Sequence, residues 1–169
     1  MNQTKLKGNP VQLKGHIPES GQTAPDFTYV TESLSEETLH DHGGKIKVII
    51  AVPSLDTGIC QLEAKRFNKE LSHHSDVAGL IVSKDLPFAM SRFCAAEGIE
   101  NVKTASDFRG DFSEKYNTLI MDGPMKGLSA RVVFVLDKDN KITYTQVTDD
   151  ITVEPNYEEA LKAVEKLKN

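Results

Sequence analysis

The sequence contains no tryptophan and only two cysteines, Cys60 and Cys94, among its 169 residues. A zinc site built mainly of thiolates needs more cysteines than this, so that class of metal site is excluded. The two cysteines are also too far apart in the sequence to form a CxxC redox motif. In a secreted protein the two cysteines could form a structural disulfide. In a reducing compartment they are either free core residues or a redox pair.

The sequence also lacks a long apolar run and an excess of positive charge. No apolar run approaches the ~20 residues that span a bilayer, and the residues that follow Met1 lack the apolar core of a signal peptide. We therefore expect a cytoplasmic protein without a membrane partner. The formal net charge of −5 and the pI near 5.5 argue against a broad nucleic-acid surface. The length and the 38% hydrophobic content predict one domain over residues 1–169.

The pattern of apolar runs and turn residues predicts an α/β fold. Polar and apolar residues alternate on both sides of Gly8-Asn9-Pro10, which predicts a β-hairpin at about residues 3–14. Two nearly continuous apolar runs, 45–52 and 77–82, are typical of strands buried in the middle of a sheet. A helical pattern follows each run. The second helix starts at Leu86 and ends at Gly98, and we expect Asp85 to cap it.

The shorter elements and the last third of the chain complete this prediction. We expect an extended segment at 25–30, a surface loop or helical turn at 33–44, a short strand at 101–104 and a helical turn at 112–116. Residues 131–136 and 142–147 predict an antiparallel hairpin, and Asn156 is expected to cap a final helix. The first half then needs parallel crossovers and the second half an antiparallel edge. This order predicts a thioredoxin-like fold, with a mixed central sheet flanked by helices.

The most informative segment is PSLDTGIC, residues 53–60, which connects an apolar strand to a helix. Cys60 lies in the first turn of that helix and begins an apolar stripe that continues through Ala64, Phe67 and Leu71. We expect Thr57 to be the N-cap, with its hydroxyl accepting a hydrogen bond from an amide of the first turn, at Ile59 or Cys60. The positive end of the helix dipole then favours a thiolate at Cys60.

A thiolate that attacks a peroxide needs hydrogen-bond donors for the leaving oxygen and partial exclusion of water. Thr57 and Pro53 are placed to shape and shield such a pocket. Arg131, at the start of an apolar strand, is a candidate for the fixed cation, because its planar fork can donate to a thiolate and to an oxygen together. The alternative is that Cys60 is a small buried hydrophobe and Arg131 a solvated strand end.

The pattern Pro53-x-x-x-Thr57-x-x-Cys60 resembles the active-site motif of the peroxiredoxins. The fuller form resembles the Tpx-type thiol peroxidases, which are atypical two-cysteine peroxiredoxins, although Ile59 stands where that family often has valine. The resemblance covers nearly the whole chain and implies the peroxiredoxin type of the thioredoxin-like fold. It extends through KLKGNPVQLKG, APDFT, RFCAAEGIENV, SDFRGDF, DGPMKGLSARVVFVLD and ITVEPNYEEAL.

The resemblance also implies a role for each site residue. Cys60 corresponds to the peroxidatic cysteine that becomes a sulfenic acid, and Cys94 to the resolving cysteine of the same subunit. Thr57 corresponds to the threonine that bonds thiolate and peroxide, Pro53 to the proline that covers the nucleophile, and Arg131 to the arginine that stabilises both. The implied substrates are hydrogen peroxide and alkyl hydroperoxides, the electron donor is thioredoxin, and the working unit is a homodimer. No metal, haem, flavin or other cofactor is expected.

The implied disulfide places a demand on the fold. Its Cα atoms must approach within ~4.4–6.8 Å, yet both cysteines are predicted to lie in helices on different segments. We therefore expect local unwinding around Ile59-Cys60 and around Phe93-Cys94. Two other interpretations stay open on the sequence: a redox sensor in which turnover is incidental, and a non-catalytic thioredoxin-like domain with a structural bridge.

Overall fold

The structure is a computed structural model that describes residues 3–168. Its helices are α1 (Gly58–Leu71), α2 (Pro87–Glu97), α3 (Phe112–Lys115) and α4 (Tyr157–Leu167), with a 3₁₀ turn η1 (Leu39–His42). Within these residues, no helix is both long and apolar enough to cross a membrane. Its strands are β1 (Gln3–Leu6), β2 (Asn9–Gln12), β3 (Thr28–Val30), β4 (Glu36–Thr38), β5 (Ile46–Ala51), β6 (Val77–Ser83), β7 (Lys103–Ser106), β8 (Val132–Leu136) and β9 (Ile142–Val147).

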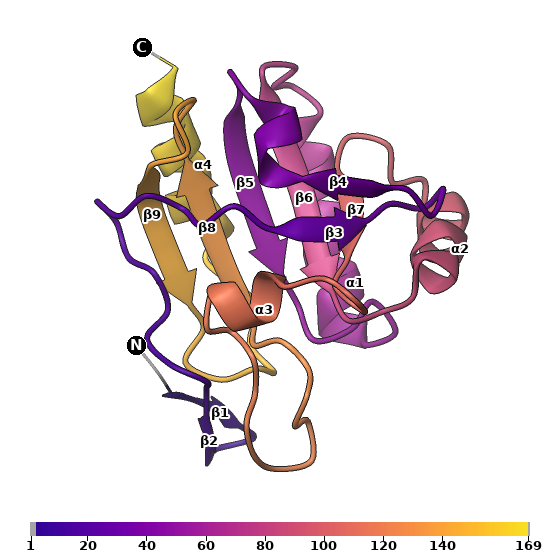
Figure 1. Cartoon of the computed structure of the whole chain (residues 1–169), viewed down its shortest axis with the longest axis vertical. Helices are drawn as coiled ribbons and strands as arrows, with labels where there is room; N and C mark the ends of the chain where they lie inside the picture. The colour runs from indigo at the N-terminus through magenta and orange to yellow at the C-terminus, as the bar shows by residue number, and fades with distance from the viewer. Residues whose placement is uncertain (1–2, 169) are drawn as a thin grey trace.

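Seven of the strands form one mixed sheet in the order β4-β3-β7-β6-β5-β8-β9, and β1 and β2 form a separate hairpin (Figure 1). The pairs β5–β6 and β6–β7 are parallel, whereas β5–β8 and β8–β9 are antiparallel. Every residue of β5 is buried, because this strand lies between two neighbours and is covered on both faces. The predicted α/β fold, with a mixed sheet and an N-terminal hairpin, is confirmed.

The alternation of side chains along β5 divides the core into two layers. Val48 and Ile50 face a cluster that includes residues of α1, α2 and α4, and both cysteines belong to this cluster. Ile49 and Ala51 face the opposite cluster, which includes residues of α3 and of the segment before β3. Figure 1 shows α1 and α4 behind the sheet and α3 in front of it. Cys60 and Cys94 are therefore on the same side of the sheet.

Several predicted boundaries need correction. The N-terminal hairpin turns at Lys7 and Gly8, whose φ angles are positive (51° and 85°), so Asn9 and Pro10 lie in β2 and not in the turn. This two-residue turn matches the twist of the strands better than a longer one. The segment 33–44 contains the expected helical turn, η1, but also β4, which we did not predict. Its charged three-residue sequence carries no apolar alternation, because β4 is an edge strand.

The helix caps give a mixed outcome. Asn156 caps α4 by accepting from the Glu159 amide at 3.1 Å, and Gly98 ends α2 in the left-handed conformation, with φ 67°. The prediction that Asp85 caps α2 is wrong. Leu86 occupies the N-cap position, and the Asp85 carboxylate instead bonds to another loop, which is described below.

Gly79 in β6 provides a test of how tightly the layer containing the cysteines is packed. A Cβ atom at Gly79 would lie 2.6 Å from Val102 Cγ1 and 2.8 Å from Leu71 Cδ1. We expect Gly79→Ala to lower the free energy of unfolding in urea by roughly 1–3 kcal/mol, the usual effect of overpacking. Gly58→Ala is the control, because its Cβ would meet no atom within 4 Å. Equal stability of the two variants would contradict this description of the packing.

Candidate active site

The segment that follows β5 holds Cys60 at the beginning of α1. Thr57 is the N-cap, with extended backbone angles, and the Gln61 amide donates to the Thr57 carbonyl at 3.0 Å. The amides of Gly58, Ile59 and Cys60 precede this first helical hydrogen bond, as at any helix N-terminus. Their aligned dipoles place positive potential beside Cys60 and favour a thiolate there.

The Thr57 hydroxyl is not oriented as predicted. It donates to the Ser54 carbonyl at 3.0 Å and makes no capping bond to the first turn of α1. The Ser54 carbonyl also accepts from the Thr57 amide at 3.2 Å, so a compact turn offers the hydroxyl a nearby acceptor. The prediction of a hydroxyl cap is therefore wrong. The Thr57 hydroxyl donates its proton to the Ser54 carbonyl, and its oxygen can still accept a hydrogen bond from a ligand.

Arg131 reaches Cys60 across 71 positions of the sequence. Its Nη1 donates to Cys60 Sγ at 3.3 Å and to Glu63 Oε1 at 2.7 Å, and its Nε donates to the Ile151 carbonyl at 2.8 Å. The three side chains Cys60, Glu63 and Arg131 are at most 2% exposed. One buried guanidinium nitrogen thus contacts both the sulfur and a carboxylate. This excludes the interpretation of Arg131 as a solvated strand end.

Burial and charge oppose each other in this cluster. Burial by itself would lower the pKa of Arg131, but the neighbouring Cys60 and Glu63 outweigh it and raise that pKa. Burial raises the pKa of Glu63 to about 7, although Arg131 acts in the opposite direction. Glu63 Oε2 is buried and has no hydrogen-bond partner within the described chain. Ionisation of a carboxyl group with one buried oxygen that lacks a hydrogen-bond partner costs free energy. This cost agrees with the raised pKa of Glu63.

Pro53 and Cys94, the other sequence-predicted residues, are both buried. Pro53 is buried two residues after the end of β5, in the segment that leads to the Thr57 turn. Cys94 lies near the end of α2, is 8% exposed and belongs to the same apolar cluster as Cys60. Both cysteines are free thiols. Burial, with a smaller contribution from the negative charge of Glu32, raises the pKa of Cys94 to about 11. Cys94 is therefore a protonated thiol at neutral pH while α2 is intact.

Sequence reasoning missed Glu63. The available signal was its position three residues after Cys60, because that spacing places a charged residue beside the inward-facing stripe of α1. A buried carboxylate needs a cation, and Arg131 was the candidate already named. Among residues 3–168, no group of three or more histidine, cysteine, aspartate or glutamate side chains is arranged to hold a metal ion.

The raised pKa of Glu63 predicts a pH dependence of stability. The unfolded chain loses this proton near pH 4.5, whereas the folded protein keeps it until about pH 7. The folded state therefore binds more protons between these values, so the free energy of unfolding falls as the pH rises through this window. Between pH 4.5 and pH 7, the Glu63 contribution to this fall in the free energy of unfolding is about 3 kcal/mol. We expect the contribution to be absent in Glu63→Gln.

The measurement is urea unfolding at several pH values, compared as curve shapes. The exposed Glu158, changed to Gln, is the matched control and should leave the wild-type curve shape unchanged. If the Glu63→Gln and wild-type curves run parallel over pH 4.5–7, the assignment of a raised Glu63 pKa is wrong.

Comparison with known proteins places the chain in a family. Residues 19–161 match the Redoxin family. The thiol peroxidase of Leptospira interrogans is 52% identical over 166 residues, which cover 96% of this chain and 97% of that protein. The thiol peroxidase of Aquifex aeolicus is 46% identical over 162 residues, 96% of each chain.

Solved structures agree with this placement. The crystal structure of a peroxiredoxin-like protein from Aquifex aeolicus superposes with a TM-score of 0.94 at 44% identity, covering 99% of this chain and 98% of that one. A thiol peroxidase from Chromobacterium violaceum has the same fold, with a TM-score of 0.89 at 19% identity and with 97% and 95% of the chains covered. The chain therefore belongs to the Redoxin family and, within it, to the thiol peroxidases, peroxiredoxin-type enzymes that reduce peroxides with a cysteine thiol.

Proposed function

We propose that Cys60 is the cysteine that attacks the peroxide. The observation that carries this assignment is the hydrogen bond from Arg131 Nη1 to Cys60 Sγ in a buried site at the N-terminus of α1. A guanidinium and a helix N-terminus together stabilise a thiolate, the nucleophilic form of cysteine. Cys94 lacks such a cation in the described structure, and burial keeps it protonated. The two thiols are thus suited to different steps.

In the first step, the Cys60 thiolate attacks one oxygen of the peroxide. The S–O bond forms as the O–O bond breaks, so the sulfur loses two electrons and becomes a sulfenic acid. The leaving oxygen departs as alkoxide or hydroxide and takes a proton to give an alcohol or water. Arg131 stabilises the charge that moves from the sulfur to this oxygen, and the Thr57 oxygen accepts from the peroxide OH group. Pro53 helps to exclude water from the sulfur.

In the second step, the Cys94 thiol attacks the sulfenic acid of Cys60. An S–S bond forms and one water molecule leaves, which carries the sulfenic oxygen and the Cys94 proton. Cys60 lies in the first turn of α1 and Cys94 near the end of α2, and both are buried. Local opening of both helices brings the sulfurs together. Opening also hydrates Cys94, which removes the main cause of its raised pKa and lets the thiol ionise.

The remaining parts of the cycle follow from the same chemistry. A disulfide is returned to two thiols by a dithiol donor, and we propose thioredoxin in this role, with hydrogen peroxide and alkyl hydroperoxides as the substrates. The cycle depends on continuous reduction, so we propose a cytoplasmic location. We propose a homodimer as the working unit. Because the oxidised atom is a cysteine sulfur of the protein, no metal or organic cofactor enters the proposed mechanism.

Substitution of the two cysteines separates the two steps. Cys60→Ser should abolish peroxide consumption in an assay coupled to thioredoxin and its reductase, because a serine hydroxyl is not ionised at neutral pH. Cys94→Ser should still consume about one peroxide per chain, but it should not be recycled by thioredoxin. Full activity of Cys60→Ser would overturn the assignment. Recycling of Cys94→Ser by thioredoxin would overturn the disulfide step.

Hydrogen exchange tests the proposed opening. In the disulfide form, the amides near the start of α1 and around Cys94 should exchange faster than in the reduced form, whereas the amides of β5 should keep their protection. Mass spectrometry of peptides from the two forms measures this difference. Equal protection of both helical segments in the two forms would show that the disulfide forms without unwinding.

A further inference from the structure

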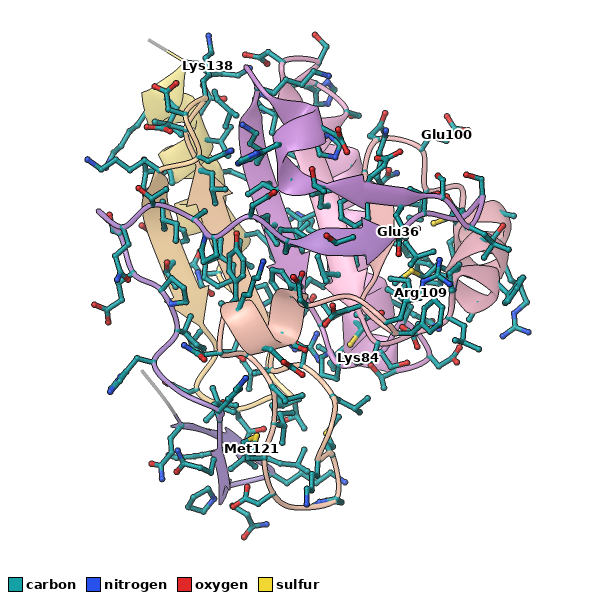
Figure 2. The ribbon with its side chains drawn as sticks, in the orientation of Figure 1. Glu36, Lys84, Glu100, Arg109, Met121 and Lys138 are labelled. Atoms are coloured by element: carbon teal, nitrogen blue, oxygen red, sulfur yellow. The ribbon has the colours of Figure 1, made fainter. Side chains whose placement is uncertain are left out.

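The Asp85 carboxylate connects the segments that carry the two cysteines. Its Oδ1 accepts from the Ser54 hydroxyl at 2.7 Å, and its Oδ2 accepts from the Leu55 amide at 2.7 Å and from the Ser83 hydroxyl at 2.6 Å. Ser54 and Leu55 belong to the loop before Cys60. Asp85 itself lies between β6 and α2, next to Lys84, which Figure 2 labels near the C-terminal end of β6.

On the side of α1, the connection continues to Thr57. The Ser54 hydroxyl donates to Asp85 and accepts from the Asp56 amide at 3.1 Å. The Ser54 carbonyl accepts from both the amide and the hydroxyl of Thr57. The orientation of the Thr57 hydroxyl thus depends on Ser54, and the position of Ser54 depends on Asp85.

On the side of α2, the same residue is anchored to the sheet. The Asp85 carbonyl accepts from the hydroxyl of Ser106, the last residue of β7, and the Asp85 amide donates to the Ser83 hydroxyl at 3.2 Å. Two residues later α2 begins, with the Ala89 and Met90 amides donating to the Leu86 carbonyl. Asp85 is therefore anchored to the sheet, accepts hydrogen bonds from the Cys60 loop and lies two residues before the helix that carries Cys94.

From these contacts we propose that Asp85 is a positioning residue that holds the peroxide-reactive arrangement closed and sets the rate at which it opens for disulfide formation. This inference rests on the proposed function. Hydrogen bonds to a carboxylate are stronger than neutral ones, and two of these bonds join the Cys60 loop to the segment before α2, which must change their relative positions for the disulfide to form. Their loss therefore favours the open state and, at the same time, disorders Thr57.

The balance between closed and open states decides the fate of the sulfenic acid. In the closed state, the oxidised Cys60 can react with a second peroxide, gaining an oxygen to become a sulfinic acid while that peroxide is reduced to alcohol or water. In the open state it condenses with Cys94. By prolonging the closed state, Asp85 speeds the first reaction with peroxide but increases the fraction of Cys60 lost to over-oxidation.

The test compares two substitutions that remove or weaken the connection with two that leave it. Asp85→Ala removes both bonds between the segments, and Ser54→Ala removes the one that the Ser54 hydroxyl donates. Ser83→Ala removes a partner of Asp85 but keeps the bonds to Ser54 and Leu55. Asp137→Ala is the matched distant control, because this carboxylate also accepts backbone amides (those of Asp139 and Lys141, at 2.9 Å). It adjoins Lys138, which lies at the other end of the central sheet from Lys84 (Figure 2).

The first readout is hydrogen exchange of the reduced proteins, which needs no turnover. Asp85→Ala and Ser54→Ala should raise exchange about tenfold in both residues 54–61 and residues 86–95, and the two controls should not. The second readout is the fraction of oxidised Cys60 that has become sulfinic acid, measured by mass spectrometry after a peroxide pulse. The two cutting variants should show a several-fold lower fraction and about tenfold slower Cys60 oxidation.

The outcomes separate this inference from the proposed function. Unchanged exchange in Asp85→Ala and Ser54→Ala would overturn the role of Asp85, whatever the enzyme does with peroxide. Slower oxidation of Cys60 with an unchanged or higher sulfinic fraction would also overturn the role of Asp85. That result would indicate general damage to the site and not a shift of the equilibrium toward the open state. Failure of the wild-type protein to form the Cys60–Cys94 disulfide would instead overturn the proposed function, and the exchange result would still stand.

Discussion

The structure of this enzyme depends on one buried guanidinium that contacts two groups able to carry negative charge. Arg131 donates from a single nitrogen to the Cys60 sulfur and to Glu63, and it is held in place by the Ile151 carbonyl. Placing a cation in the core is costly unless anions and hydrogen bonds compensate for its lost hydration. Glu63 supplies part of this compensation through its hydrogen bond with Arg131, and also through its charge when the carboxyl group is ionised. In the proposed mechanism the Cys60 thiolate supplies the rest, so the interaction that stabilises the arginine would also stabilise the proposed nucleophile.

The sheet explains why these residues meet. β5 and β8 are antiparallel, with Ala51 opposite Val132. The C-terminal end of β5 and the N-terminal end of β8 therefore lie side by side at the same end of the strands. The PSLDTGIC segment leaves from the first of these ends, and Arg131 immediately precedes the second. The register of this one strand pair therefore brings the sulfur and the cation together from distant parts of the chain.

The proposed chemistry requires a closed site for the first reaction and an open one for the second. Burial of Cys60 and Cys94 in one apolar cluster suits the closed state, because it excludes water and keeps the second thiol protonated. The same burial opposes the disulfide. Opposing demands of this kind are met by segments of low local stability, and helix ends joined to the sheet by a few hydrogen bonds have that property.

Much of this architecture was predictable from local patterns. The buried strands, the helix that begins near Cys60, the final hairpin and the N-terminal hairpin each follow from the spacing of apolar and turn residues within about ten positions. Cys60, Thr57, Pro53 and Arg131 were candidates from their positions on the predicted elements, whereas the role of Cys94 was implied by the resemblance to the Tpx-type thiol peroxidases. Polar edge elements such as β4 carried no comparable signal. The prediction failed where a side chain had several possible partners.

What the sequence by itself determined was therefore the set of elements and the position of Cys60 at a helix N-terminus, because both arise from short-range geometry. The tertiary structure decided the partners: Glu63 beside Arg131, the Thr57 hydroxyl directed to Ser54, and Asp85 bonded across to the Cys60 loop instead of capping α2. Hydrogen-bonding side chains choose among acceptors and donors within a few ångströms. Which groups lie within that distance depends on strand pairing and helix packing between segments far apart in the chain.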